Sequence, residues 1–160
     1  MVNITKPVTK NIEQIKEILS QWTEVEEVEK YITRISNEID GKTEFNMQFW
    51  IAKEDETVVG VVGLCNPLPK ILSFAKTSNP GEIKILYLDT QMQGKGIGKL
   101  LVGYVEKEAD KQGYSELLVR SAERYRDTAY GFYEKLGYLK TGIVEGGEEF
   151  KKMQVFGKVL

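Results

Sequence analysis

Apolar side chains recur at three- and four-residue steps in two successive stretches near the N-terminus. The first stripe lies within residues 9–22, and the second runs from Val25 to Ile39. This spacing is typical of amphipathic helices that pack one face on a core. Thr23 and Glu26 stand three residues apart at the start of the second stripe, a spacing that predicts a capping box. We therefore expect two helices with a short turn between them.

Shorter apolar runs, some of them alternating with polar residues, predict β-strands in the rest of the chain. The expected strands cover residues 2–5, 47–51, 58–64, 83–88, 117–119, 138–143 and 150–159. A charged loop, KEDET, joins the second and third as an antiparallel hairpin. Helical stripes follow the fourth and fifth strands, at residues 97–111 and 127–136. The last two strands flank an acidic turn, VEGGEE.

The order of these elements predicts an α/β (α+β) fold. A strand, a helix and a further strand near the middle of the chain imply one right-handed parallel crossover. The hairpin before it and the strands after it are antiparallel, so we expect a mixed, mostly antiparallel sheet with one central parallel pair. About four helices flank this sheet. A length of 160 residues predicts a single domain spanning residues 1–160.

Composition narrows the possible chemistry more than it narrows the fold. Twenty-two basic and 24 acidic residues give a net charge of −2, which disfavours nucleic acid and anionic membranes as partners. No apolar run is long enough to span a bilayer, and the N-terminus lacks the apolar centre of a secretory signal, so a cytoplasmic location is expected. There is no histidine, and Cys65 is the single cysteine, so we expect no metal site. Carboxylates, tyrosines, lysines, backbone groups or a cofactor must carry any reaction.

Three glycines at alternate positions, Gly94, Gly96 and Gly98, follow shortly after the strand at 83–88, around the start of the next helix. Glycine tolerates positive φ angles, so consecutive N–H groups of such a turn can converge on an anion at the start of a helix. A dinucleotide fingerprint needs Gly-x-Gly-x-x-Gly after the first strand, and a Walker loop needs Ser or Thr after Gly-Lys. The turn has neither spacing. A dinucleotide-binding enzyme is therefore a distant alternative.

Two motifs resemble those of the GNAT superfamily of N-acetyltransferases. The segment Gln93-Gly94-Lys95-Gly96-Ile97-Gly98 is similar to the acyl-CoA loop of that family and directly follows Leu86-Tyr87-Leu88. About 35 residues later, the segment 132–138, FYEKLGY, resembles the family pattern Phe-Tyr-x-x-x-Gly-Phe/Tyr. The frame starting at Gln91 also satisfies the first pattern, but the later frame leaves Ile97 as the first core residue of the helix. Two motifs in this order are more specific than either alone.

The resemblance implies acetyl-CoA as co-substrate and assigns residues to it. The pyrophosphate would rest on N–H groups of the glycine turn, with two lysines adding positive charge, and the pantetheine arm would pair with the preceding strand. Arg126 stands where relatives often have an asparagine, and it is a candidate phosphate ligand instead. The implied cofactor-binding residues are Leu86, Tyr87, Leu88, Gln93, Gly94, Lys95, Gly96, Ile97, Gly98, Lys99, Arg126 and Tyr130.

Acyl transfer needs a neutral amine, a stabilised oxyanion and a protonated leaving thiol. The resemblance makes Tyr133 the general acid, although a core aromatic is the other reading of this residue. Glu82, at the start of the central strand, is a candidate base; a solvated strand-end acid is the other reading, and a water relay serves equally well. The N–H of Leu88 is a candidate oxyanion donor.

We therefore expect an enzyme that transfers acetyl from acetyl-CoA to a primary amine of a small molecule or peptide. A catalytically silent acyl-CoA-binding or sensor module of the same fold is the alternative. The resemblance also makes a homodimer more plausible than a monomer. Trp50, Phe74 and the connection at 66–81 are candidates for lining the acceptor site.

Overall fold

The computed structural model describes residues 1–147 and 151–160. Contacts between residues divide the chain into two compact units. Unit 1 comprises Met1–Cys65 and Ile85–Val105, and unit 2 comprises Asn66–Lys84 and Glu106–Leu160. The single domain expected for residues 1–160 stays a prediction.

The strands form the mixed sheet that the sequence predicted. They are β1 (Val2–Thr5), β2 (Gln48–Glu54), β3 (Thr57–Cys65), β4 (Pro80–Leu88), β5 (Glu116–Ala122), β6 (Leu139–Glu145) and β7 (Lys152–Val159). Their order in the sheet is β1-β2-β3-β4-β5-β7-β6. β4 and β5 pair in parallel, whereas β1 with β2, β2 with β3, β5 with β7 and β6 with β7 pair antiparallel. The predicted parallel crossover is therefore confirmed.

Helices connect these strands. The α-helices are α1 (Ile12–Ser20), α2 (Val25–Ile39), α3 (Ile97–Lys111) and α4 (Gly131–Lys135). The short helices are η1 (Thr9–Asn11), η2 (Pro69–Phe74), η3 (Thr90–Met92), η4 (Glu123–Tyr125) and the π-helix η5 (Arg126–Tyr130). Phe150, the predicted start of the last strand, and part of the acidic turn fall on residues 148–150 and lie outside the described residues.

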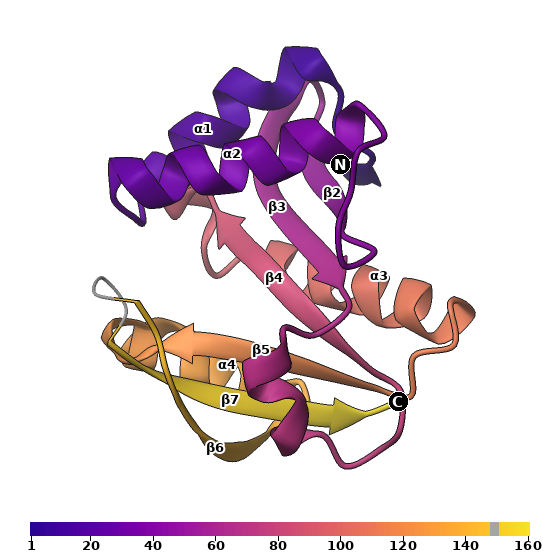
Figure 1. The fold of residues 1–160 in the computed structure, drawn as a ribbon. Coiled ribbons are helices and arrows are strands. Elements are labelled where there is room, and N and C mark those ends of the chain that lie inside the picture. The colour runs from indigo at the N-terminus through magenta and orange to yellow at the C-terminus, as the bar shows by residue number, and fades with distance from the viewer. Residues whose placement is uncertain (148–150) are drawn as a thin grey trace. The chain divides into compact units, whose positions relative to one another are not determined.

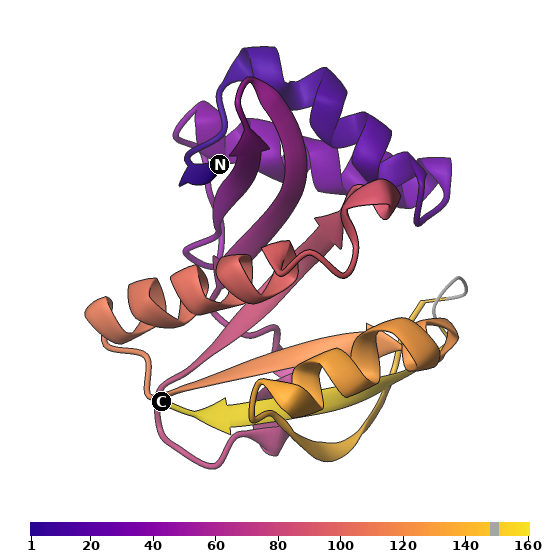
Figure 2. The ribbon, with the colours of Figure 1, turned by 180° about the vertical axis from the view of Figure 1, so that it is seen from behind.

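In unit 1, helices cover both faces of the β2–β3 hairpin (Figures 1 and 2). Helices α1 and α2 bury their apolar stripes against one face, where Ile15, Ile35 and Phe49 are fully buried in one core. α3 lies on the other face, because a Cβ at Gly60 would stand 2.9 Å from Leu101. Gly60 therefore permits close packing of β3 on α3.

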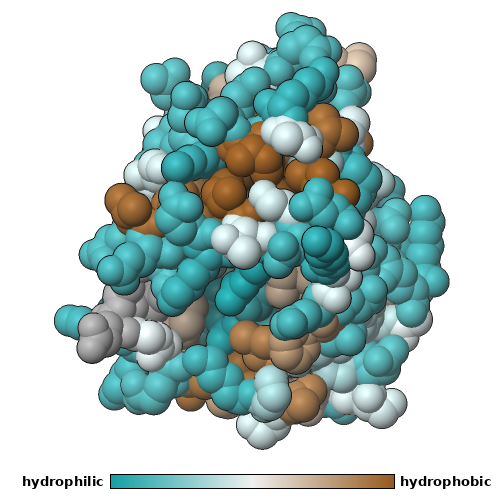
Figure 3. Space-filling view, turned by 45° about the horizontal axis from the view of Figure 1, so that its top comes forward, coloured by the Kyte–Doolittle hydropathy of each residue, from teal (hydrophilic) through white to brown (hydrophobic). Residues whose placement is uncertain are grey.

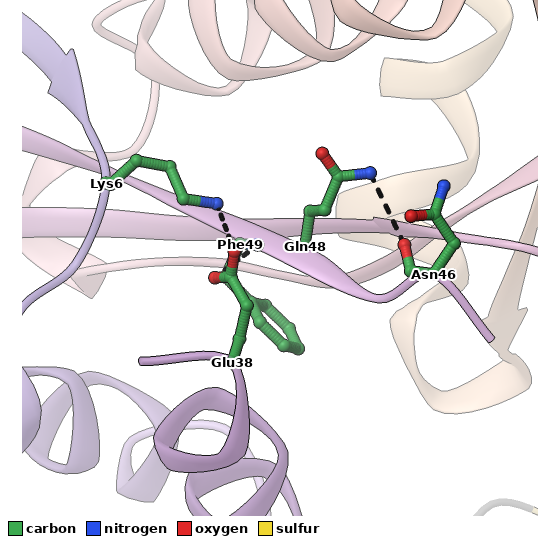
Figure 4. A network of polar contacts seen from close by, with 5 residues as sticks. All are labelled: Lys6, Glu38, Asn46, Gln48 and Phe49. Carbon is green, nitrogen blue, oxygen red and sulfur yellow. Dashed lines mark hydrogen bonds and ion pairs between the residues drawn. The ribbon is translucent and has the colours of Figure 1, made fainter. Parts of the chain in front are cut away.

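A carboxylate near the C-terminal end of α2 ties three segments of unit 1 together (Figure 4). The N–H of Phe49 in β2 donates to Glu38 Oε1 at 3.1 Å, and Lys6 Nζ donates to Glu38 Oε2 at 2.5 Å. The same ammonium lies 4.4 Å above the Trp50 ring. Glu38 thus anchors α2 to the hairpin and to the segment that follows β1.

In unit 2, the strands β5, β7 and β6 are covered on both faces (Figures 1 and 2). Ile71 of η2 packs with Leu118 and Val155 on one face. On the opposite face, Tyr130 and Tyr133 contact the ring of Phe156. The alternation of side chains along β7 therefore serves two separate apolar layers.

Two details of the predicted helices are wrong. The N-cap of α2 is Glu24, without a side-chain cap bond, so Thr23 and Glu26 form no capping box. The N–H of Thr23 donates to Leu19 O at 3.1 Å, so Thr23 lies in the turn that follows α1, one residue before the N-cap of α2. Val25 begins the predicted apolar stripe of α2. It is 77% exposed, because it is the first residue of that helix.

Charged side chains dominate the outer surface of the N-terminal helices. Figure 3, which brings these helices toward the reader, shows a mostly hydrophilic face with hydrophobic patches among the polar groups. Lys16 of α1 pairs with Glu29 of α2 at 3.2 Å, and both side chains are largely exposed. Such surface pairs stabilise little, so burial of the apolar stripes holds this layer in place.

Candidate active site

A backbone irregularity interrupts β4 before the predicted acyl-CoA loop. Ile85 has a φ of 54°, a left-handed conformation that a β-branched residue rarely adopts. The parallel ladder with β5 runs from Pro80, opposite Glu116, to Ile83, opposite Val119, and ends two residues before Ile85. Strain of this kind costs about 1–3 kcal/mol and is concentrated at functional sites. No sequence signal pointed to Ile85, because isoleucine is an ordinary strand residue.

Two of the three glycines have positive φ angles, and Gly98 is the second residue of α3. Gly94 has a φ of 76° and Gly96 a φ of 83°, both in the left-handed region. A Cβ added at either position would meet no atom within 4 Å. The two glycines are therefore needed for their backbone angles, and the space beside the turn is open to a ligand.

Helix α3 begins directly after this turn. Ile97 is its first residue and is buried, as the preferred motif frame expected. The N–H groups of the first helical turn have no partners within the helix and form the positive end of the helix dipole. Lys95 and Lys99 are exposed, and within the described residues neither is paired with an acid. Glycines, free N–H groups and two lysines together suit a phosphate group.

Tyr87 packs between two aromatic rings, one from the turn after α1 and one from α2. Its ring centroid lies 6.4 Å from that of Trp22 and 6.1 Å from that of Tyr31. Leu86 and Leu88, on either side, are half-buried at the end of β4. The strand segment assigned to pantetheine binding is therefore fixed by side chains in the core of unit 1.

Unit 2 contains the predicted general acid. Tyr133 of α4 is 6% exposed, and its ring packs on Phe132, Tyr138 and Phe156 with centroids 5.2, 5.9 and 5.5 Å away. Burial raises the pKa of the Tyr133 phenol well above its ordinary value. The phenol is therefore protonated at neutral pH, as a general acid must be before it acts.

Two further predicted ligands lie on the π-helix that precedes α4. The Tyr130 hydroxyl donates to the carbonyl of Ser121 at 3.4 Å, and its ring lies 5.3 Å from Phe156. Arg126 is exposed and donates to Glu123 Oε1 at 2.5 Å. π-helical turns are frequent at functional sites, and this one was predicted as an ordinary helix over residues 127–136.

Glu82 is the third residue of β4 and is only 1% exposed. The alternative of a solvated strand-end acid is therefore wrong. Arg120 Nε donates to Glu82 Oε2 at 2.9 Å, and the N–H of Leu68 donates to Glu82 Oε1 at 3.3 Å. Sequence reasoning missed Arg120, although a charge within a buried strand is a signal that an opposite charge lies nearby.

The predicted site residues are thus divided between the two compact units. Unit 1 contains Leu86, Tyr87, Leu88, Gln93, Gly94, Lys95, Gly96, Ile97, Gly98 and Lys99. Unit 2 contains Glu82, Arg126, Tyr130 and Tyr133. Phe74 packs against Gly142 in unit 2, and Trp50 against Tyr104 in unit 1.

Two kinds of feature are absent from residues 1–147 and 151–160. No group of three or more His, Cys, Asp or Glu side chains there is placed to hold a metal ion. Among the same residues, no helix has the length and apolar character needed to cross a membrane.

Comparison with known proteins identifies the family. The sequence model of the acetyltransferase (GNAT) family matches residues 12–138, which include the glycine turn and Tyr133. The chain belongs to the GNAT acetyltransferase family. Human N-acetyltransferase 8B is 35% identical over 96 residues, a match that covers 59% of this chain and 39% of that protein. The match thus spans about two-fifths of that relative's length.

Solved structures show the same GNAT fold. A protein described as a GNAT-family acetyltransferase from Desulfovibrio desulfuricans superimposes with a TM-score of 0.82, at 15% identity and with 99% of each chain covered. The PaiA N-acetyltransferase of Thermoplasma acidophilum, solved in complex with coenzyme A, gives a TM-score of 0.69 at 20% identity. That alignment covers 100% of this chain and 99% of that one.

Proposed function

We propose that this GNAT-family protein transfers an acetyl group from acetyl-CoA to a primary amine of a small molecule or peptide. The observation that carries the proposal is the junction of β4, the glycine turn and α3. Gly94 and Gly96 hold positive φ angles there, beside open space and at the start of a 15-residue helix. This arrangement suits the pyrophosphate of a CoA thioester.

The glycine turn supplies the binding part of the proposal. N–H groups from Gly94 to Lys99 donate hydrogen bonds to the pyrophosphate oxygens. The ammonium groups of Lys95 and Lys99 add electrostatic attraction to the phosphate charges. Backbone groups of Leu86 to Leu88 pair with the pantetheine arm as an added strand would. In unit 2, Arg126 and Tyr130 are the proposed additional contacts to the cofactor.

The reaction forms a C–N bond and breaks the C–S bond of the thioester. The neutral amine attacks the thioester carbonyl carbon, and the N–H of Leu88 stabilises the negative charge that develops on the carbonyl oxygen. The intermediate expels the thiolate, and the Tyr133 phenol donates a proton to its sulfur. The proton lost by the amine leaves through a base to solvent, and the Tyr133 phenolate takes a proton back from solvent, so the products are the amide and free CoA.

The base is Glu82 or a water chain. Each Glu82 carboxylate oxygen already accepts one hydrogen bond, from Arg120 or from Leu68, and each keeps a second lone pair. Direct proton uptake by Glu82 weakens a buried ion pair, which carries an energetic cost. A chain of waters that carries the proton to solvent leaves the Glu82–Arg120 pair charged and serves equally well as the base.

Ligand binding tests the first half of this proposal. Isothermal titration of the protein with acetyl-CoA and CoA is expected to give saturable binding below millimolar concentration, whereas NAD and ATP bind more weakly. Absence of binding to either CoA compound at millimolar concentration contradicts the proposal. Preference for NAD or ATP instead supports a nucleotide-binding function.

Turnover tests the second half. A panel of small amines, aminoglycosides, polyamines and peptide N-termini is incubated with acetyl-CoA, and free thiol is detected. Thiol release that depends on one class of amine, with the acetylated product seen by mass spectrometry, identifies the acceptor. Binding of acetyl-CoA without thiol release from any amine identifies the silent acyl-CoA-binding module instead.

A further inference from the structure

The turn between α1 and α2 is rigidly closed. Gln21, Trp22 and Thr23 follow the last residue of α1, and the N–H groups of Trp22 and Thr23 both donate to Leu19 O, at 3.0 and 3.1 Å. The N–H of Gln21 donates to Ile18 O at 3.1 Å. The side chains of Gln21 and Trp22 therefore leave the helix from fixed backbone positions.

These two side chains bind the backbone at the end of β4. Trp22 Nε1 donates to the carbonyl of Leu88 at 2.6 Å. The N–H of Thr90 donates to Gln21 Oε1 at 2.8 Å. Both contacts join residues nearly 70 positions apart in the sequence, at 66 and 69 positions respectively. The turn that follows α1 is thus hydrogen-bonded to the end of β4 on either side of Asp89.

The peptide group that carries the Leu88 carbonyl is also held from the other edge. The N–H of Asp89 donates to Val59 O of β3 at 2.9 Å. The N–H and C=O of one strand residue point to the same edge, and those of the next residue point to the opposite edge. Leu88 therefore presents its N–H and its C=O to the edge away from β3, and the Trp22 indole occupies the C=O on that edge.

The indole makes a ring contact as well as a hydrogen bond. Its centroid lies 6.4 Å from that of Tyr87, with the planes inclined by 40°. Tyr31 of α2 contacts the same tyrosine ring at 6.1 Å, so ring packing at Tyr87 does not depend on Trp22 alone. The bond to the Leu88 carbonyl is the feature that sets Trp22 apart from Tyr31.

We infer that Trp22 is a positioning residue for the acetyl-transfer step. Its indole N–H fixes the peptide group between Leu88 and Asp89. That group shares the Leu88 Cα with the peptide that carries the Leu88 N–H, so the indole helps to hold this N–H toward the developing oxyanion. The inference rests on the proposed function, because it gives Trp22 a role only through the oxyanion donor at Leu88. A misdirected donor loses part of the transition-state stabilisation while leaving cofactor binding on the glycine turn intact.

The experiment removes the indole N–H and keeps the ring. Trp22 is replaced by phenylalanine and, more narrowly, by benzothienylalanine, which has sulfur in place of the N–H. Tyr31→Leu is the matched control, because it removes a ring from the Tyr87 contact without removing the Leu88 bond. Three quantities are measured for each variant: amide hydrogen exchange over residues 86–90, kcat with the best amine, and KM for acetyl-CoA.

We expect both Trp22 replacements to speed amide exchange at Asp89 and Thr90 and to lower kcat about tenfold, with KM for acetyl-CoA changed less than about twofold. Tyr31→Leu keeps kcat near that of the wild type. Unchanged exchange, or faster exchange with unchanged kcat, overturns the inference. A wild-type protein that transfers acetyl to no amine overturns the proposed function and with it the catalytic role of Trp22. In that case the amide hydrogen exchange over residues 86–90 still shows whether the Trp22 indole orders the end of β4.

Discussion

Three positive φ angles shape the segment from β4 to α3, but they have different origins. Gly94 and Gly96 adopt theirs at little cost, because glycine has no Cβ to clash. Ile85 adopts its φ of 54° against the preference of a β-branched side chain, and it is 9% exposed within the core of unit 1. Burial of its side chain offsets the backbone strain. The turn is thus permitted by its residue types, whereas the irregularity in β4 occurs at a residue type that disfavours it.

Gly96→Ala tests the backbone requirement of the turn. Alanine at a φ of 83° is strained although its Cβ meets nothing within 4 Å, so we expect a loss of about 1 kcal/mol of unfolding free energy. Distortion of the N–H groups should weaken acetyl-CoA binding roughly tenfold. Urea unfolding and isothermal titration measure the two effects.

Gly103→Ala is the control for that substitution. Gly103 lies within α3, a Cβ there also meets nothing within 4 Å, and its φ is not positive. We expect this change to stabilise the protein by about 0.5–1 kcal/mol and to leave acetyl-CoA affinity unchanged. Equal affinity of the Gly96 and Gly103 variants would remove the turn from the binding site.

Tyr133→Phe removes the proposed acid and keeps the buried ring. The ring contacts to Phe132, Tyr138 and Phe156 survive, so the melting temperature should change little. We expect kcat to fall about 10²- to 10³-fold, with acetyl-CoA affinity within about twofold of the wild type. Steady-state kinetics and titration calorimetry separate the two. A rate equal to that of the wild type would assign Tyr133 to the core alone.

At the scale of elements, the long connection between β3 and β4 is an ordered layer of unit 2. Ile71 within it is fully buried, and the N–H groups of Lys76 and Thr77 donate to the buried carboxylate of Glu116 at 2.8 and 2.6 Å. A Cβ on Gly142 would stand 2.3 Å from the Phe74 ring, so β6 accepts the connection only because that position is glycine. Hydrogen bonds to the carboxylates of Glu82 in β4 and Glu116 in β5 hold its backbone.

The Glu82–Arg120 ion pair joins β4 to β5. Removing only one of its two partners should lower the free energy of unfolding strongly. Arg120→Ala leaves a carboxylate that is 1% exposed without its cation, and we expect a loss of about 3–5 kcal/mol. The double variant Glu82→Gln, Arg120→Met keeps an acceptor for the Leu68 N–H and removes both charges. It should lose about 1–2 kcal/mol. Urea unfolding of the three proteins gives the comparison.

The same double variant bears on catalysis. If Glu82 accepts the amine proton, directly or through water, the double variant folds but transfers acetyl slowly at neutral pH. Retention of the wild-type rate in a folded double variant would restrict Glu82 to a structural role. A single variant cannot make this distinction, because it leaves an unpaired buried charge that lowers stability and activity together.

At the scale of the whole molecule, the chain combines two compact units, each with its own apolar core. β4 and α3 contribute residues to both units. The proposed cofactor-binding turn belongs to unit 1 and the proposed acid to unit 2. The homodimer expected from the family resemblance stays a prediction, which size-exclusion chromatography with light scattering will measure.

Alkaline pH should destabilise the whole protein. Burial raises the pKa of both Tyr133 and Tyr138 above the ordinary 10.0, and for Tyr138 the Glu106 carboxylate, at 2.9 Å from its hydroxyl, adds to the shift. Above pH 10 the unfolded chain therefore releases protons that the folded protein retains. Stability is complete below that pH and falls above it by about 1.4 kcal/mol per pH unit for each tyrosine.

Urea unfolding at a series of pH values between about 8 and 11 measures this slope. Tyr133→Phe should reduce the slope by the share of one tyrosine, because its phenylalanine binds no proton in either state. A free energy of unfolding that stays constant above pH 10 would contradict the assignment of buried, protonated phenols.

The amino-acid sequence by itself determined the order of elements, the mixed sheet with its parallel crossover and the glycine turn. These features depend on local spacing: the 3.6-residue and two-residue apolar periods and the backbone freedom of glycine. Local spacing also produced the error at α2, since the Thr23–Glu26 pattern matches a capping box although the N-cap is Glu24 and Thr23 lies in the turn after α1.

Only the tertiary structure decided the contacts between distant positions. The Trp22 bond to Leu88 spans 66 positions and the Arg120 bond to Glu82 spans 38, and neither leaves a periodic trace in the sequence. The positive φ of Ile85 is likewise invisible in its residue type. Local patterns specify which elements form, because they act over one or two turns of chain. The orientation of the Leu88 peptide and the burial of Glu82 depend on side chains that only folding brings together.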